Sequence, residues 1–163
     1  MKTSKTKLDE LVIKKLVIKK IKERDAEKVY SLGVQAFEGE LWLTRKFIKG
    51  AIKNGICFGA FLDKKLLGAI IVKVLDKPKA WIYFFVVDKK YRRKKIGTIL
   101  LKKAEKKLPK GYYLLCVDLE NKDVSGKKFY IKNGFKESAK IKDWFGINKT
   151  GIIFTKKIKK CHH

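Results

Sequence analysis

The sequence is almost without histidine: the only two, His162 and His163, are its last residues. A histidine in that position is a poor candidate for a catalytic base or a metal ligand inside a fold. We therefore expect no Ser-His-Asp triad, no Cys-His dyad and no histidine-bearing zinc site, and no metal is predicted. The terminal pair is also typical of the remnant of a purification tag, with a native pair as the alternative.

Cysteines and long hydrophobic runs are also scarce. Cys57, Cys116 and Cys161 have no Cys-x-x-Cys spacing and are too few for a disulfide framework, so ordinary thiols in a reducing compartment are expected. The longest apolar run, residues 81–87, is far shorter than the ~18–20 residues of a membrane helix. The polar residues 1–7 do not resemble a signal peptide. These features predict a cytoplasmic protein with no membrane partner.

Acidic residues are few: 16 Asp and Glu stand against 42 Lys and Arg, a formal net charge of +26. Such a charge favours polyanionic partners, for example nucleic acid, the ribosome or a phosphorylated cofactor. The same excess of lysine is also explained by genome composition or a hot habitat, so composition leaves both interpretations open. Hydrophobic residues make up 45% of the chain, which is enough to form a core.

The length of 163 residues predicts one domain, with a core at about 16–157, a basic lead-in at 1–15 and a basic tail at 158–163. Hydrophobic periodicity predicts an α/β layered domain with a mixed sheet. Asp25, Thr44 and Asp123 are expected to cap helices. The apolar segment 80–87 is expected to be a strand buried on both faces. The other predicted strands are 16–21, 56–62, 66–75, 112–118, 135–142 and 151–157, and the longer helices begin after 25 and 44 and span 97–108 and 123–132.

Residues 82–101 are the most informative segment, because a buried strand leads through a basic turn into an amphipathic helix. The first turn of a helix has unpaired backbone N–H groups and a partial positive charge, so it is a ready site for phosphate. The alternative is a solvated basic turn before an ordinary helix. No P-loop and no Gly-x-Gly-x-x-Gly fingerprint of a dinucleotide-binding fold is found.

Two motifs resemble those of the GNAT N-acetyltransferases. Arg92-Arg-Lys-Lys95-Ile-Gly97 is similar to the family's Arg/Gln-x-x-Gly-x-Gly/Ala motif, with Lys95 in place of the first glycine and Lys89 where a proline is common. Asp123-Val-Ser-Gly-Lys-Lys-Phe-Tyr-Ile-Lys-Asn-Gly-Phe135 is similar to the family's second motif, a capped helix that ends in Phe-Tyr-x-Lys-x-Gly-Phe. The resemblance covers about residues 16–157.

The resemblance implies the GNAT, or acyl-CoA N-acyltransferase, fold: a mixed, mostly antiparallel sheet of about seven strands flanked by about four helices. It implies that acetyl-CoA is the co-substrate and binds where the sheet opens between strands 81–87 and 112–118. The cofactor-binding residues that it implies are Phe85, Val86, Val87, Arg92, Arg93, Lys94, Lys95, Ile96, Gly97, Thr98, Asp123, Ser125, Gly126 and Lys128.

The implied reaction is direct attack of a primary amine on the thioester, with Tyr130 as the general acid for the leaving thiolate. Alternatively, Tyr130 only packs its helix onto the sheet. Tyr83 stands where many family members have a glutamate base. Glu38, Glu40 and Asp118 remain as base candidates, although a plain surface acid is the preferred interpretation of each.

The residues that would shape the acceptor pocket, unless they belong to the core, are Trp42, Tyr83, Asp118, Trp144 and Phe145. The acceptor itself stays open. A peptide or protein amine is preferred, and polyamines rank lower because a strongly positive enzyme repels them. The alternatives are a non-catalytic nucleic-acid- or ribosome-associated protein on the same scaffold, and a degenerate member that binds coenzyme A without activity. A homodimer is the general expectation for the oligomeric state.

Overall fold

The computed structural model describes residues 10–159, so Cys161, the two histidines and the outer parts of the basic lead-in and tail lie outside the described residues. Residues 10–15 are helical. The strands are β1 (Leu16–Lys20), β2 (Ile56–Leu62), β3 (Lys65–Val74), β4 (Lys79–Val87), β5 (Leu114–Glu120), β6 (Lys136–Ile141) and β7 (Gly151–Lys157). The helices are η1 (Glu23–Asp25), α2 (Ala26–Ala36), α3 (Arg45–Lys53), η2 (Lys89–Tyr91), α4 (Ile96–Lys106) and α5 (Val124–Lys132).

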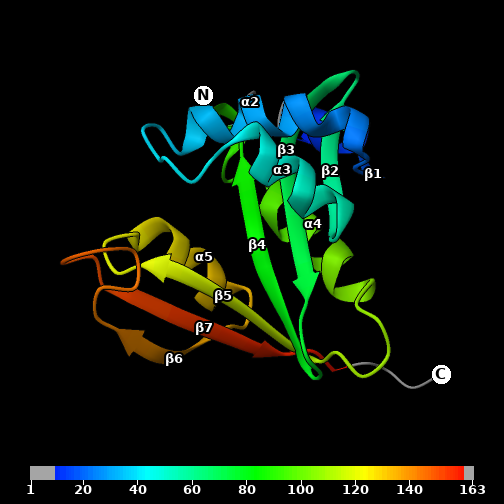
Figure 1. The fold of residues 1–163 in the computed structure, drawn as a ribbon. Helices are drawn as coiled ribbons and strands as arrows, with labels where there is room; N and C mark the ends of the chain where they lie inside the picture. Colours follow the sequence, from blue (N-terminus) through cyan, green and yellow to red (C-terminus); the bar gives the residue numbers. More distant parts are fainter. Residues whose placement is uncertain (1–9, 160–163) are drawn as a thin grey trace, which may run out of the picture. The chain divides into compact units, whose positions relative to one another are not determined.

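The seven strands form one sheet in the order β1-β2-β3-β4-β5-β7-β6 (Figure 1). Four of its ladders, β1 with β2, β2 with β3, β5 with β7 and β6 with β7, are antiparallel, and β4 pairs with β5 in parallel. The predicted fold class, a mostly antiparallel seven-stranded sheet with flanking helices, is therefore confirmed. Parallel pairing of β4 with β5 is limited to three residue pairs, from Lys79↔Leu114 to Trp81↔Cys116.

The chain divides into two compact units. The first unit contains the described residues up to Lys73 together with Tyr83–Lys107, and the second contains Val74–Ile82 together with the described residues from Leu108 onward. The chain passes between them three times: at the end of β3, within β4 and just after α4.

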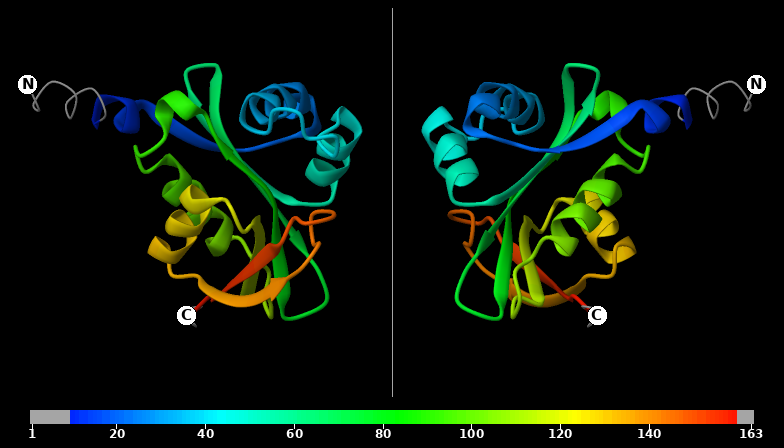
Figure 2. Two further views of the ribbon diagram at one scale, coloured as in Figure 1. Left: turned by 90° about the vertical axis from the view of Figure 1, so that its left-hand side faces the viewer. Right: turned by 90° about the vertical axis from the view of Figure 1, so that its right-hand side faces the viewer.

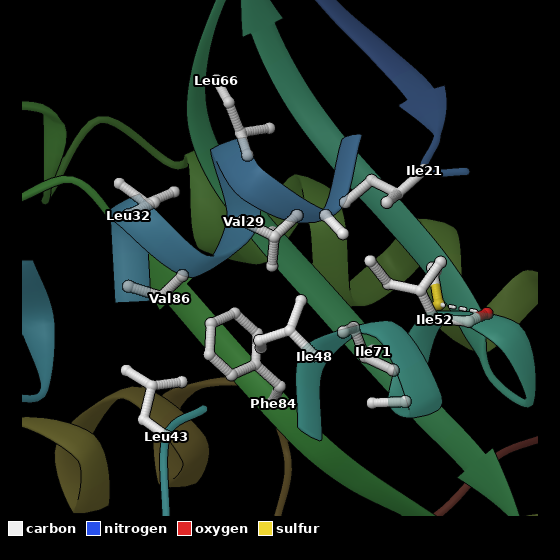
Figure 3. Packing of buried hydrophobic residues seen from close by; sticks show 14 of the residues in the cluster. Ile21, Val29, Leu32, Leu43, Ile48, Ile52, Leu66, Ile71, Phe84 and Val86 are labelled. Carbon is white, nitrogen blue, oxygen red and sulfur yellow. Dashed lines mark hydrogen bonds between the residues drawn. The ribbon is translucent and has the colours of Figure 1, made fainter. Parts of the chain in front are cut away.

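In the first unit, helices α2 and α3 lie on one side of strands β2 and β3 and helix α4 lies on the other (Figure 2). The core between α2, α3 and the sheet is fully apolar. Val29 of α2 and Ile48 of α3 pack against Ile71 of β3 and Phe84 of β4 (Figure 3). All four of these side chains are at most 3% exposed.

Local side-chain hydrogen bonds set the ends of the helices. Thr44 caps α3 as predicted, because its hydroxyl accepts a hydrogen bond from the Phe47 N–H at 3.0 Å. Asp123 likewise caps α5 by accepting from the Gly126 N–H at 2.8 Å. The prediction for Asp25 is wrong in detail: its carboxylate accepts from the Lys22 N–H instead, because a short η1 turn precedes α2.

Strand β4 departs from its predicted burial. Its even-numbered residues Ala80, Ile82, Phe84 and Val86 are buried, but Tyr83 is 41% exposed. The continuous run of apolar residues therefore does not reflect burial on both faces. One face carries the core, and the other carries aromatic side chains that are only partly covered.

In the second unit, β7 lies between β5 and β6 (Figure 1). Its core contains Leu115 of β5, Phe154 of β7 and Tyr130 of α5.

Cys57 of the first unit and Cys116 of the second are both buried free thiols, and burial raises the pKa of Cys57 to about 12. None of the helices within residues 10–159 has the length and apolar character needed to cross a bilayer.

Candidate functional site

The turn between β4 and α4 is built by short-range hydrogen bonds of the backbone and of Asp88. The Asp88 carboxylate accepts from the Lys90 N–H at 2.9 Å, which starts the η2 turn. The Asp88 N–H donates to the Leu67 carbonyl at 2.8 Å, which holds the turn against β3. The Arg92 side chain then folds back, and its Nε donates to the Val87 carbonyl at 3.1 Å. The basic turn is therefore ordered, although Arg92, Arg93 and Lys95 are exposed.

Two residues of this turn adopt left-handed backbone conformations. Arg93 has a φ of 60° and Lys95, the N-cap residue of α4, has a φ of 63°. Glycine adopts this region at no steric cost, whereas a lysine or arginine there is strained. The structure thus explains the motif's glycine at the position of Lys95: the turn keeps the glycine conformation even though the residue is a lysine.

Helix α4 presents its N-terminus next to this turn. Buried Ile96, Leu100, Leu101 and Ala104 anchor the helix in the first unit. The first turn contains no acidic residue, and the Lys95 side chain makes no capping hydrogen bond. The N–H groups at the start of the helix and the surrounding cations therefore form an electropositive end that suits an anionic group.

The predicted cofactor-binding residues of the first unit meet at this place. Val86 and Ile96 are buried, so their side chains belong to the core and only their backbone groups are available to a ligand. A cavity of about 170 Å³ lies beside the turn, and it is lined by Leu32, Gln35, Ala36, Val87, Asp88, Lys89 and Lys90. Phe85, Val87, Lys94, Gly97 and Thr98 are partly exposed along the strand and the first helical turn.

An aromatic cluster of the first unit joins the loop before α3 to strand β4. It consists of Phe37, Trp42, Phe47 and Tyr83. Phe47 contacts two of the other rings. Trp42 packs edge-on against it at a ring distance of 5.2 Å, and Tyr83 stacks on it, also at 5.2 Å. The Lys73 ammonium lies 3.9 Å from the centre of the Tyr83 ring. The predicted acceptor residues Trp42 and Tyr83 are therefore brought together, each about two-fifths exposed.

The base candidates Glu38 and Glu40 lie in the loop between α2 and α3, and both are exposed. Burial does not single out either of them, and exposure of this kind is what an ordinary surface acid shows. Their role as a base remains a prediction.

Asp118 of β5 lies at the centre of a hydrogen-bonded group in the second unit. Its Oδ1 accepts from the Trp81 indole at 2.7 Å, and its Oδ2 accepts from the Trp144 indole at 2.9 Å. The structure thus brings together the two predicted acceptor residues Asp118 and Trp144. Phe145 follows Trp144 in the loop between β6 and β7 and is 40% exposed.

Tyr130 lies in the buried part of α5, with only 5% of its surface exposed. Its ring packs edge-on against Phe129 and Phe135 at 5.2 and 5.1 Å. Burial, followed by the negative charges of Asp123 and Asp118, raises its pKa well above the usual value for tyrosine. The phenol therefore keeps its proton at neutral pH. The predicted cofactor residues Asp123, Ser125 and Lys128 are exposed near the start of the same helix, and Gly126 is partly exposed.

Three residues of these clusters were not predicted from the sequence: Phe47, Lys73 and Trp81. Hydrophobic periodicity places each of them on a helix face or in a strand and says nothing more about it. Their signal is spatial, because Trp81 and Asp118 are 37 positions apart in the chain. No cluster of three or more His, Cys, Asp or Glu side chains with metal-binding geometry occurs within residues 10–159.

Comparison with known proteins identifies the family. The family model of the acetyltransferase (GNAT) family matches residues 22–135. The chain is 34% identical over 108 residues to spermidine N(1)-acetyltransferase of Thermoplasma acidophilum, which is 60% of this chain and 66% of that protein. It is 36% identical over 94 residues to N-alpha-acetyltransferase 30 of Xenopus laevis, which is 53% of this chain and 33% of that protein. The matched part of the chain therefore spans less than two thirds of the length of each of these two curated relatives.

A solved structure supports the same conclusion. The PaiA N-acetyltransferase of Thermoplasma acidophilum, in complex with coenzyme A, superposes with a TM-score of 0.72 at 26% identity, over 87% of this chain and 98% of that one. The fold and the turn before α4 thus define a protein of the acyl-CoA N-acyltransferase class. The chain belongs to the GNAT acetyltransferase family.

Proposed function

We propose that the protein transfers an acetyl group from acetyl-CoA to a primary amine, with a peptide or protein amine as the preferred acceptor. The observation that carries the proposal is the turn between β4 and α4, in a chain of the GNAT family. Its two left-handed residues, its exposed cations and the N-terminus of α4 form a cradle for a diphosphate.

The residues present suit coenzyme A. Arg93 and Lys95 supply cations beside the helix N-terminus, and the first turn of α4 has no acidic side chain to repel a phosphate. The backbone groups of Phe85, Val86 and Val87 at the end of β4 are the proposed contacts of the pantetheine arm. Acetyl-CoA supplies the activated acyl group as a thioester.

Tyr130 is the proposed proton donor for the leaving thiolate. A group that donates a proton must be protonated at the working pH, and burial raises the pKa of Tyr130 and so satisfies this condition. The acceptor amine must be neutral to attack. An α-amino group, with a pKa of about 8, meets this requirement more readily than a lysine side chain at about 10.4.

Two acceptor classes follow from the relatives. The name of the Xenopus laevis relative favours α-amines, and that of the Thermoplasma acidophilum relative favours spermidine. We prefer the peptide amine because the chain has a net charge of +26 and because Lys73 already places an ammonium on Tyr83. Both features disfavour spermidine, because a polycationic acceptor is repelled by a positively charged protein.

Ligand-induced stabilisation tests the first part of the proposal. Acetyl-CoA at 100 times its dissociation constant stabilises a protein by about 2.7 kcal/mol, which is visible as a rise in the unfolding temperature. We expect this rise with acetyl-CoA and a smaller one in Arg93→Ala. Lys53→Ala, which removes a cation from the end of α3, is the matched control. No rise with the wild-type protein would refute the proposal.

Thiol release from acetyl-CoA tests the reaction. The acceptors are short peptides with different N-terminal residues, the same peptides with a blocked N-terminus, and spermidine. We expect turnover with the free peptides and a loss of roughly 10²–10⁴-fold in kcat for Tyr130→Phe. Tyr113→Phe, on an exposed tyrosine of the same unit, is the control. Full activity of Tyr130→Phe would show that this tyrosine is not the acid.

A further inference from the structure

We propose that Asp118 is a positioning residue for acceptor recognition: it holds Trp144 and thereby fixes the orientation of the loop between β6 and β7. The inference rests on the proposed function and on the expectation that Trp144 and Phe145 of this loop help to shape the acceptor pocket. It assigns to Asp118 a role different from that of a general base, and it adds Trp81 as a second partner of the same carboxylate.

The geometry at Asp118 is that of a shared acceptor. The two indole N–H groups of Trp81 and Trp144 each donate to a different oxygen of the carboxylate, at 2.7 and 2.9 Å. Trp81 comes from β4, Asp118 from β5 and Trp144 from the loop, so three segments meet at one side chain. Hydrogen bonds to an ionised acceptor are stronger than neutral ones, so this carboxylate is a firm attachment point.

The site of Trp144 is also shaped by Gly151, the first residue of β7. A Cβ atom built on Gly151 would lie 2.5–2.7 Å from three atoms of Trp144, far inside van der Waals contact. The indole therefore packs directly on the backbone of β7, and only glycine leaves room for it. This is independent of the hydrogen bond to Asp118 and shows that the position of Trp144 is defined by two features of the fold.

The loop itself is internally closed, so fixing Trp144 fixes its whole tip. The Asp143 carbonyl accepts from the Gly146 N–H, and the Asp143 carboxylate accepts from the Asn148 N–H at 2.6 Å. Phe145 and Lys149 are joined by a backbone hydrogen bond of 3.2 Å. The tip presents Phe145 at 40% and Ile147 at 87% exposure, an apolar surface on a protein rich in lysine.

The same geometry argues against Asp118 as the base. A base must accept the proton of the attacking amine, and both carboxylate oxygens of Asp118 already accept from indoles. Protonation would turn these two charge-assisted hydrogen bonds into weaker, neutral ones. A residue that anchors a loop in this way acts on the acceptor through Trp144, not by contact with the reacting atoms.

Fluorescence of Trp144 tests the anchor without a substrate. In a Trp42→Phe/Trp81→Phe background, Trp144 is the only tryptophan, because the chain has three. Adding Asp118→Ala removes both acceptor oxygens, so the Trp144 indole loses its partner, and we expect a red-shifted emission and stronger quenching by acrylamide. Glu120→Gln, the next acidic residue of β5, is the matched control and should change neither signal. Unchanged emission and quenching in Asp118→Ala would overturn the anchor.

Kinetics test the functional consequence. With a peptide substrate from the acceptor panel, Asp118→Asn should raise the KM for the peptide by about tenfold, roughly the effect of one lost net hydrogen bond, and leave the KM for acetyl-CoA unchanged. Trp144→Phe should have a similar effect, and the double variant should add nothing further. Additive effects, or a fall in kcat with an unchanged KM, would overturn the positioning role.

The two hypotheses fail in different ways. If acetyl-CoA does not stabilise the wild-type protein, the proposed function fails, although the fluorescence signals still report on the anchor. If acetyl-CoA binds and peptides are acetylated but Asp118→Asn behaves like Glu120→Gln, only the positioning role of Asp118 fails.

Discussion

The backbone at Lys95 offers a sharp test of the turn before α4. Lys95 has a φ of 63°, and the left-handed region costs a non-glycine residue about 1–2 kcal/mol. Glycine avoids that cost but loses about 0.5–1 kcal/mol through the greater freedom of the unfolded chain. Lys95→Gly should therefore stabilise the protein by a net of about 0.5–1 kcal/mol.

The assay is thermal unfolding of the full chain, measured by circular dichroism for the wild type and the variants under the same conditions. For a protein of this size, a gain of 1 kcal/mol corresponds to a rise of about 2–4 °C in the unfolding temperature. Lys95→Ala is the necessary control, because it removes the same charge but keeps a Cβ in the left-handed conformation. We expect the alanine variant to unfold close to the wild-type temperature.

The comparison of the two variants separates backbone strain from charge repulsion. Lys95 follows Arg92, Arg93 and Lys94 in a chain of net charge +26, so relief of repulsion is the competing explanation. Equal stabilisation by glycine and alanine would refute the argument from φ. If the Lys95 cation also binds a phosphate, both variants should bind coenzyme A more weakly, and to a similar extent.

Three further predictions concern the first unit. Leu100→Ala should destabilise the protein by about 2–5 kcal/mol in urea unfolding, because Leu100 is 0% exposed in the core. The hydrogen bond from Arg45 lowers the pKa of Glu27, so the pair contributes stability above the carboxylate's unfolded pKa and loses it as the pH falls through the lowered folded value. The difference in unfolding temperature between the wild type and Glu27→Gln should shrink from neutral pH to about pH 3. Lys73→Met should raise kcat/KM for spermidine by about 2–5-fold, because it frees the Tyr83 ring for another cation.

Much of the fold could be predicted because its signals are local. Thr44 directly precedes the helix that it caps, and Asp123 directly precedes α5, so cap and helix can be recognised from neighbouring residues. Asp25 shows the limit of this reasoning, since a capping residue has several backbone N–H groups within reach. The choice of the Lys22 N–H depends on the η1 turn, which periodicity does not reveal.

The parts of the candidate site also differ in whether their residues are neighbours in the sequence. The turn at 92–95 and the helix N-terminus are contiguous in the chain, so the motif could be found from the sequence. The aromatic cluster and the Asp118 group are assembled from distant segments: Asp118 is 37 residues from Trp81 and 26 residues from Trp144. Sequence reasoning named Asp118 and Trp144 separately, but only the three-dimensional structure shows that they share a hydrogen bond.

Residues 10–159, the part that the structure describes, contain no histidine, which has a consequence for the pH profile. Histidine is the side chain that ordinarily titrates between about pH 5 and 8, and burial keeps the proposed acid Tyr130 protonated throughout that range. Ionisation of the acceptor amine should therefore control the rise of kcat/KM with pH. A midpoint near 8 would identify an α-amino acceptor, and a rise that continues toward about 10 would identify a lysine side chain. A midpoint near 6.5 with every acceptor would require a different titrating group and would contradict this mechanism.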